Sequence, residues 1–266
     1  IELFRNIPVL LQILFWYNLF INAFPHPKQS FSFFDIAFLN QRGLYMPKPI
    51  PEEGFIFVAL SLLIGIITAY FIKKFYKKKH ELTGIHTSTW PYTTALVLGL
   101  PLIVYLILGS PLQFDLAVLG KFNLKGGMTI VPEFLALAFA LSVYTATYIA
   151  EAIRSGIEAV DKGQKEAAAA IGLSPVQSLK LIVLPQALRV AIPPTINQYL
   201  NLTKNSSLAT VIGYPELMSS FGGTVLNQVG QAVEILGMAM LVYLVISLVI
   251  SLLLNYVNKK MAIQGR

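Results

Sequence analysis

Residues 161–185 read DKGQKEAAAAIGLSPVQSLKLIVLP and are the most informative stretch of the chain. The first half is too polar to cross a membrane and is rich in alanine, the best helix former, so it predicts a short helix in water. Gly172 stands where a glycine can adopt the left-handed conformation that ends a helix. Ser174 and Pro175 then offer an N-cap and a first-turn proline. We therefore predict helix, turn and second helix, with Pro185 marking the entry into the next segment.

Apolar segments lie on both sides of this stretch. The chain of 266 residues is 55% hydrophobic and only 12% charged, whereas soluble proteins average about 25% charged residues. A membrane-spanning helix needs about 20 mostly apolar residues. Six segments meet this requirement at least loosely, and they are residues 7–24, 55–72, 92–109, 128–150, 187–213 and 233–257. We expect an all-α, polytopic transmembrane helix bundle that is almost entirely helical.

The basic residues indicate the orientation of these spans. One alternating set of loops holds 14 of the 20 Lys and Arg residues, and the other set holds five. Cytoplasmic loops carry an excess of Lys and Arg. We therefore place residues 161–185 and the C-terminus in the cytoplasm. Because the basic residues follow the ends of apolar runs, membrane topology explains them better than a nucleic-acid partner does.

Several kinds of chemistry are excluded or disfavoured. The chain contains no cysteine, so disulfides, thiolate metal sites and cysteine nucleophiles are absent. The histidines, His26, His80 and His86, form no i, i+4 pair, and we expect no metal site. The sequence has no G-x-x-x-x-G-K-[ST] phosphate loop, so we expect neither a catalytic residue nor a cofactor in this chain.

The spacing of residues 166–185 resembles a known family signature. Glu166-Ala167-Ala168, then Gly172, Ile182, Leu184 and Pro185, fill every fixed position of E-A-A-x3-G-x9-I-x-L-P. This is the EAA signature of the permease subunits of ABC importers of the type I fold. The segments RNIPVLLQ (5–12), YIAEAIR (148–154), NLTKNSSLA (201–209) and IGYPEL (212–217) are similar to the polar and general L-amino-acid permeases of that family.

The resemblance implies a single permease domain over residues 1–266. Its parts are core spans at 1–24, 128–156, 187–213 and 232–258, an inserted span pair at 55–109, and a cytoplasmic coupling loop at 157–186. Because the chain opens at Ile1 without methionine and the family has a membrane helix before the position of Arg5, we expect a further span to precede this segment.

The resemblance also implies the partners and the site. We expect a multi-pass protein of the bacterial inner membrane in a heteromeric importer of amino acids. Its partners would be a second, homologous but different permease chain, a dimeric ATPase that binds ATP and magnesium, and an extracytoplasmic amino-acid-binding protein. The residues implied to couple this chain to the ATPase are Glu166, Ala167, Ala168, Gly172, Leu173, Leu184 and Pro185.

The fifth segment is unusually polar for a membrane span. Asn197, Asn201, Lys204 and Asn205 recur at helical spacing, and such a stripe would not face lipid. It either contacts the amino acid in transit or joins this subunit to the neighbouring permease through hydrogen bonds. Lys204 is expected to pair with a carboxylate or with helix carbonyls, and Pro193-Pro194 predict a kinked or broken helix.

The fourth segment carries two tyrosines one helical turn apart. Tyr144 and Tyr148 could line the substrate path, although a tyrosine in such a span is more often a structural hydrogen-bonding group. Glu151 and Arg154, three residues apart at the cytoplasmic end, predict a local ion pair with a possible gating role.

Two other functions remain as alternatives. The first is a secondary amino-acid transporter or channel that works without ATP, and the second is an assembly factor for other membrane proteins. A secondary transporter is expected to show an inverted repeat and carboxylates within the membrane. The sequence shows no repeat, and Glu133 and Glu151 lie near span ends, so the EAA loop favours the importer.

Overall fold

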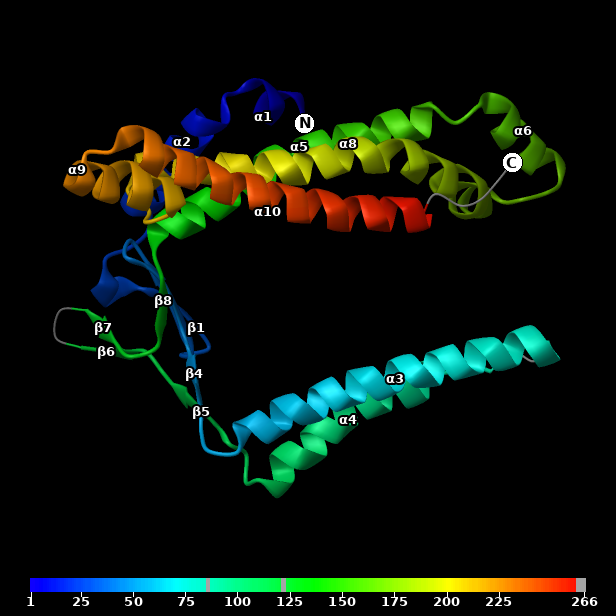
Figure 1. Cartoon of the computed structure of the whole chain (residues 1–266), viewed down its shortest axis with the longest axis horizontal. Coiled ribbons are helices and arrows are strands. Elements are labelled where there is room, and N and C mark those ends of the chain that lie inside the picture. Colours follow the sequence, from blue (N-terminus) through cyan, green and yellow to red (C-terminus); the bar gives the residue numbers. More distant parts are fainter. Residues whose placement is uncertain (85–86, 121–122, 262–266) are drawn as a thin grey trace. The chain divides into compact units, whose positions relative to one another are not determined.

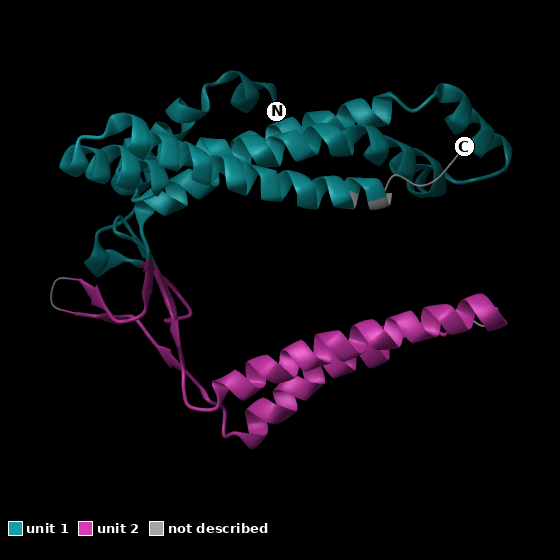
Figure 2. Ribbon diagram, viewed as in Figure 1, with its two compact units in different colours: residues 1–30, 39–44, 130–266 teal, residues 31–38, 45–129 magenta. Residues whose placement is uncertain are grey.

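The chain folds into two compact units (Figures 1 and 2). The computed structural model describes residues 1–84, 87–120 and 123–261, without the side chains of residues 257, 260 and 261. His86, one of the three histidines, therefore lies outside the described residues. Unit 1 comprises Ile1–Ser30, Leu39–Leu44 and Ile130–Arg266, and unit 2 comprises Phe31–Phe38 and Tyr45–Thr129.

Unit 1 is helical. It begins with α1 (Glu2–Asn6), α2 (Val9–Ala23) and the short 3-10 helix η1 (Pro27–Gln29). Its main body consists of α5 (Pro132–Glu158), α6 (Lys162–Ala170), α7 (Pro175–Ser178), the π-helical turn η2 (Leu179–Val183), α8 (Leu184–Asn205) and the 3-10 helix η3 (Ser206–Ile212). The π-helical η4 (Ser219–Val225), α9 (Leu226–Val229) and α10 (Ala232–Met261) complete it.

Unit 2 contains the inserted span pair, α3 (Phe55–Thr83) and α4 (Trp90–Ile107). The buried residues of α3 are Ser61, Gly65 and Ala69, which recur every four residues and form one narrow face. A Cβ on Gly65 would lie 3.2 Å from the Leu96 carbonyl oxygen. The two helices therefore pack closely through small residues, as membrane helices often do.

Short strands occupy the two loops that flank the inserted pair. They are β1 (Phe31–Phe33), β2 (Ala37–Asn40), β3 (Gly43–Met46), β4 (Lys48–Pro51), β5 (Leu112–Asp115), β6 (Val118–Leu119), β7 (Leu124–Lys125) and β8 (Met128–Ile130). The strand orders are β1-β2-β3-β8, β4-β5 and β6-β7. The expected all-α helix bundle is confirmed. These loop strands were not expected, because no single strand is long enough to show an alternating pattern in the sequence.

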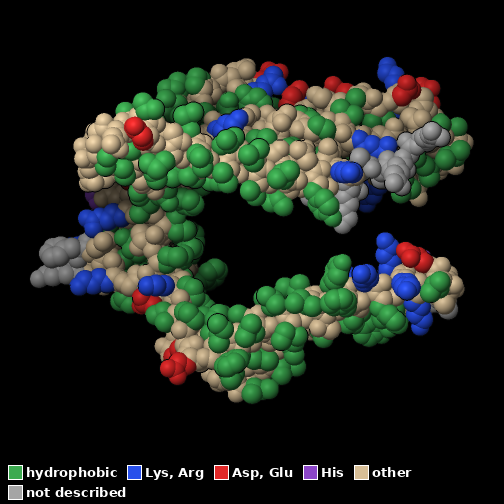
Figure 3. All heavy atoms as spheres, in the orientation of Figure 1, with side chains coloured by type: hydrophobic (Ala, Val, Ile, Leu, Met, Phe, Trp, Pro, Cys, Tyr) green, Lys and Arg blue, Asp and Glu red, His purple; other side chains and the backbone are tan. Residues whose placement is uncertain are grey.

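Five helices in the described part of the chain are long and apolar enough to cross a membrane. They correspond to five of the six expected segments. The first segment differs, because Pro8 separates α1 from α2 and leaves only the 15 residues of α2 as an apolar helix. Figure 3 shows hydrophobic side chains over the surfaces of the long helices, as expected for helices that face lipid or other subunits.

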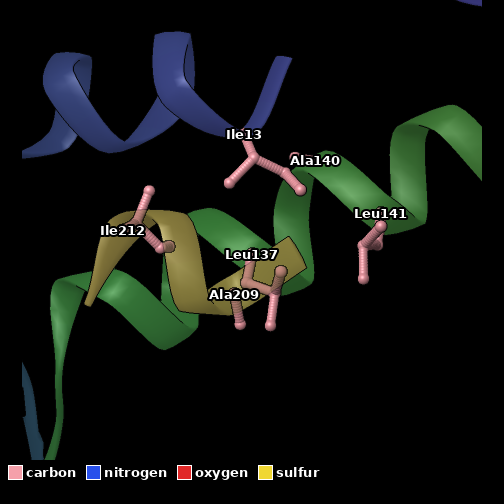
Figure 4. Packing of buried hydrophobic residues seen from close by; sticks show 6 residues of the cluster. All are labelled: Ile13, Leu137, Ala140, Leu141, Ala209 and Ile212. Atoms are coloured by element: carbon pink, nitrogen blue, oxygen red, sulfur yellow. The ribbon is translucent and has the colours of Figure 1, made fainter. Parts of the chain in front are cut away.

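The core of unit 1 lies where α2, α5 and η3 meet (Figure 4). It contains Ile13 of α2, Leu137, Ala140 and Leu141 of α5, and Ala209 and Ile212 of η3. Trp16 of α2 packs edge-on against Phe139 of α5 with ring centroids 4.5 Å apart. This core fixes the start of α5 and the end of the α8–η3 helix.

The opposite end of α5 approaches α8 at backbone distance. Gly156 is buried, and a Cβ at this position would lie 2.5 Å from the Ala187 carbonyl oxygen and 3.3 Å from the Ala191 Cβ. Only glycine permits this approach. The contact fixes the two helix ends from which the loop at residues 159–174 projects.

A carboxylate holds the chain that follows η3. Glu216 accepts hydrogen bonds from the backbone N–H groups of Met218 (2.8 Å) and Ser219 (2.6 Å), from the Thr210 hydroxyl, and from the Tyr243 hydroxyl of α10 (3.0 Å). Partial burial acts to raise the pKa of Glu216, but these four hydrogen bonds favour the carboxylate and lower the pKa below its ordinary value of 4.5. The sequence had shown Glu216 as part of a family-like segment without giving it a role.

The Gly156 contact generates a test of helix packing. Gly156→Ala is expected to destabilise unit 1 by about 1–3 kcal/mol, because the added methyl group forces α5 and α8 apart. Gly237→Ala in α10 is the matched control, since a Cβ there meets nothing within 4 Å. Thermal unfolding of the purified protein in detergent should show a lower midpoint for the first variant alone. Equal midpoints would contradict the close approach.

The Glu216 network predicts a pH dependence. Because the folded-state pKa is lowered, its contribution to stability is complete above the ordinary carboxyl pKa of 4.5 and is lost as the pH falls below it. Hydrogen exchange at the Met218 and Ser219 amides should accelerate over that range. In Glu216→Gln these amides should exchange fast at every pH, whereas Glu234→Gln, at an exposed carboxylate of α10, should behave as wild type. Amides that stay protected in Glu216→Gln would exclude this role.

Candidate functional site: the loop between α5 and α8

The loop between α5 and α8 has the local structure that its sequence predicts. Helix α6 is capped by Asp161, whose carboxylate accepts a hydrogen bond from the Gly163 N–H at 2.6 Å. Glu166, Ala167 and Ala168 lie in this helix. Glu166 and Ala167 are exposed, and Ala168 is the one residue of α6 that is buried. The carboxylate of Glu166 therefore faces away from the rest of the chain.

Gly172 makes the turn that ends α6. Its φ of +81° lies in the left-handed region, where residues with a Cβ are strained. The N–H groups of Gly172 and Leu173 donate to the carbonyls of Ala169 (3.0 Å) and Ala168 (3.1 Å), the pattern of a Schellman-type helix end. A Cβ on Gly172 would meet no atom within 4 Å, so the requirement for glycine here is conformational rather than steric.

Ser174 begins the second helix as predicted. Its hydroxyl accepts a hydrogen bond from the Gln177 N–H (3.4 Å), and its own N–H donates to the Gln177 side chain (2.9 Å). This reciprocal pair is a capping box. Pro175 occupies the first turn, where its missing N–H costs nothing.

Pro185, expected to mark the entry into the next segment, does not separate the second helix from that segment. The segment from Pro175 to Ile212 is one helical element of 38 residues. The π-helical turn η2 precedes Pro185, and the Leu184 N–H donates to the Leu179 carbonyl five residues earlier. Because proline lacks an N–H, it cannot continue the regular α-helical hydrogen-bond pattern. A π turn changes that pattern locally without ending the helix. Leu184 is exposed, and Pro185 is half-buried.

The loop stands on a small apolar base. Val160, Val183 and Ala187 are buried together, and Ile157 packs against them. By contrast, Ile171 is 75% exposed and Val176 is 59% exposed. These two exposed apolar side chains lie on either side of Gly172 in the sequence.

A network of ionic and hydrogen bonds joins α1 to the C-terminal half of α5. Glu151 lies 3.7 Å from Arg154, which confirms the predicted local pair, and 3.6 Å from Arg5. The Tyr148 hydroxyl lies 3.4 Å from the Arg5 carbonyl oxygen and 3.1 Å from the Tyr144 hydroxyl. The two tyrosines thus hydrogen-bond within the chain, which favours the structural role over the path-lining role.

Gln12 is a further residue whose role the sequence did not reveal. It is 3% exposed, and its amide nitrogen donates to the carbonyls of Phe4 (2.6 Å) and Ile7 (3.0 Å). These carbonyls belong to the interrupted turn before Pro8, where the helix cannot supply donors. The segment RNIPVLLQ (5–12) contained the signal for this role of Gln12, because Pro8 breaks the helix and Gln12 lies one turn after it.

The polar stripe of the fifth segment lies on the outer face of α8. Asn197, Asn201 and Lys204 are exposed and Asn205 is half-buried, whereas the buried residues of α8 are Ala187, Ala191 and Ile196. The stripe is therefore available to a substrate or a neighbouring subunit.

Within the described residues, Lys204 is in no ion pair and α8 has no break at Pro193-Pro194. The ion pairs of that part of the chain are those of Glu151, and neither includes Lys204. Its side chain instead lines an open groove against Met240, Tyr243 and Leu244 of α10. Helix α8 continues through Pro193 and Pro194, and irregular turns lie at its two ends instead.

Comparisons with known proteins place these features in a family. The model of the family "Binding-protein-dependent transport system inner membrane component" matches residues 1–263. YhdX of Escherichia coli strain K12, named as a candidate amino-acid ABC transporter permease, is 50% identical over all of this chain and 68% of its own length. The general L-amino acid transport system permease protein AapQ of Rhizobium johnstonii is 49% identical over all of this chain and 66% of its own length.

A solved structure is also similar. The crystal structure of an amino acid ABC transporter with histidines is 25% identical, covers 76% of this chain and 88% of its own, and has a TM-score of 0.45. The present chain spans about two thirds of the length of the two sequence relatives. Since the family model matches nearly the whole chain, the protein belongs to the inner-membrane components of binding-protein-dependent transport systems, the permeases of ABC importers.

Proposed function

We propose that this permease imports amino acids and that the loop at residues 157–186 couples it to a separate ATPase subunit. The observation that carries the proposal is the exposed α6–Gly172–Ser174 elbow, which presents the EAA residues away from the chain while its base is buried. A free loop could not transmit force, whereas this one is capped at both helices and packed at its root.

The surface of the elbow suits a protein partner. Glu166 supplies an exposed carboxylate, and Ile171 and Val176 supply exposed apolar groups on either side of Gly172. Such a mixture of an apolar centre and a polar rim is typical of protein interfaces. The partner is the ATPase, which would hold the ATP and magnesium and perform the hydrolysis, while this chain contributes no catalytic group.

The long helical element from Pro175 to Ile212 would transmit a motion of the elbow into the membrane. This element begins in the elbow and carries the polar stripe in its second half. A displacement of the elbow would therefore move Asn197, Asn201 and Lys204 as one rigid body. Leu173 lies within the elbow, and Leu184 and Pro185 lie between the elbow and the stripe, so these residues would carry that displacement.

Amino acids are the proposed substrates because the sequence relatives are named as permeases for them. The chemistry of the stripe is compatible with this class, since an ammonium and several amides can hydrogen-bond a carboxylate. An interface with a second permease is the competing role of the stripe. We assign Tyr144 and Tyr148 to structure rather than to substrate contact, because they hydrogen-bond each other and Tyr148 also donates to the Arg5 carbonyl oxygen.

The proposed assembly contains this chain, a homologous second permease, a pair of ATPase subunits and an extracytoplasmic binding protein. The chain lies in the bacterial inner membrane, with the elbow and the C-terminus in the cytoplasm. The description of the family as binding-protein-dependent supports the binding protein, and the excess of Lys and Arg on one set of loops supports the orientation.

Gly172→Val tests the coupling. Valine disfavours the left-handed backbone of this turn by about 1–2 kcal/mol, so the elbow should lose its direction while the complex stays in the membrane. We expect loss of both transport and substrate-stimulated ATP hydrolysis in proteoliposomes. Gly84→Val is the control, because Gly84 has a φ of +68° with equally open surroundings at the end of α3. Persistence of both activities in Gly172→Val would make the coupling assignment wrong.

Lys204→Ala separates the two roles of the polar stripe. If Lys204 contacts the substrate carboxylate, the complex should assemble normally on detergent gels, and the half-saturating amino-acid concentration should rise about tenfold or more, since a charged hydrogen bond is lost. Dissociation of the permease subunits on those gels, with substrate preference unchanged in any intact complex, would assign the stripe to the subunit interface instead.

A further inference from the structure

The cytoplasmic half of α3 carries the strongest concentration of positive charge in the described chain. Lys73, Lys74, Lys77, Lys78 and Lys79 follow directly on the apolar part of this helix. The sequence had placed them in a loop, whereas α3 continues to Thr83 and holds them on a rigid surface. All five are exposed, and Figure 3 shows Lys and Arg side chains gathered at one end of the α3–α4 pair.

Two of these lysines line a pocket in unit 2. The pocket has a volume of 350 Å³, within the range of about 300–1,000 Å³ typical of small-molecule sites. Lys73 and Lys77 come from α3, and the hydroxyl groups of Thr87, Ser88 and Thr89 come from the segment before α4. Trp90, the first residue of α4, also lines the pocket. The pocket thus combines two ammonium groups with several hydroxyl donors.

Neither Lys73 nor Lys77 has an ion-pair partner within the described residues. The ion pairs among residues 1–84, 87–120 and 123–261 both involve Glu151, so none joins a carboxylate to Lys73 or Lys77. Glu81, the acidic residue on the same part of α3, does not line this pocket but the neighbouring hollow, which Lys77 also borders. The pocket therefore offers uncompensated ammonium groups to an anion.

The level of the pocket along the helices indicates where that anion comes from. Tyr70 and Phe71 precede Lys73 on α3, Trp90 and Tyr92 begin α4, and all four aromatic side chains are more than half exposed. Exposed Trp and Tyr at the ends of apolar spans are typical of the membrane interface. At this depth the abundant anions are phospholipid headgroups, and their acyl chains would lie along the exposed apolar faces of α3 and α4.

We propose that this pocket binds the phosphate of an anionic phospholipid headgroup, with Lys73 and Lys77 as ionic contacts and the hydroxyls of residues 87–89 as hydrogen-bond donors. Basic pockets between membrane helices recognise headgroups in this way. The bound lipid would bridge α3 and the start of α4, and so hold the ends of the inserted helix pair together. The proposal requires only that the pair spans a membrane and does not depend on which substrate is carried.

The test compares two double variants of the purified complete importer. Lys73→Gln/Lys77→Gln removes both pocket lysines, whereas Lys74→Gln/Lys78→Gln removes the same charge from the same helix but leaves the pocket intact. All four lysines are exposed, so neither variant is expected to disturb folding. Each delipidated complex is titrated with phosphatidylglycerol or phosphatidylcholine, and native mass spectrometry counts the lipids retained by this subunit.

We expect wild type to retain phosphatidylglycerol in preference to phosphatidylcholine. The pocket variant should bind phosphatidylglycerol about 30-fold more weakly, since each lysine near a headgroup contributes about fivefold, and the control variant should stay within about threefold of wild type. Equal losses in both variants would reveal diffuse charge attraction and overturn the pocket. Displacement of the lipid by millimolar inorganic phosphate, or by an acidic segment of a partner subunit, would equally overturn it.

Discussion

The backbone contact between α5 and α8 is the constraint on which the functional part of this protein depends. Gly156 lets the Ala187 carbonyl oxygen approach so closely that a methyl group would not fit. Because the two helices meet there, the loop between them must leave the bundle at one place and in one direction. Val160 and Val183 then close the root of the loop. The EAA residues therefore keep their position relative to α5 and α8, because these two helices cannot separate.

The local structure of the elbow could be predicted from sequence because each of its signals acts within a few residues. Asp161 and Ser174 cap the nearest turn, Gly172 supplies the left-handed residue, and alanine supplies the helix between them. The family assignment followed from the same residues, because the spacing from Glu166 to Pro185 is a property of the sequence alone. The family model confirms that assignment.

Other features could not be predicted because they depend on residues far apart in the chain. The Arg5–Glu151 pair joins positions that only the packing of α1 against α5 brings together, so the sequence revealed only the local Glu151–Arg154 pair. The hydrogen bond from Tyr243 to Glu216 spans two helices in the same way. The π turn before Pro185 was missed for a different reason. A proline predicts that a helix is disturbed, but not whether it ends or changes its hydrogen-bond register.

We propose that the elbow faces the cytoplasm, where an ATP-hydrolysing subunit can reach it. Because the chain has no cysteine, a single Ile171→Cys variant reports this directly through a membrane-impermeant maleimide, Ile171 being among the most exposed residues of the loop. We predict no labelling in intact cells and strong labelling in inside-out membrane vesicles stripped of the ATPase, with protection when the ATPase is added back. Labelling of Cys-substituted chain from outside intact cells would contradict it.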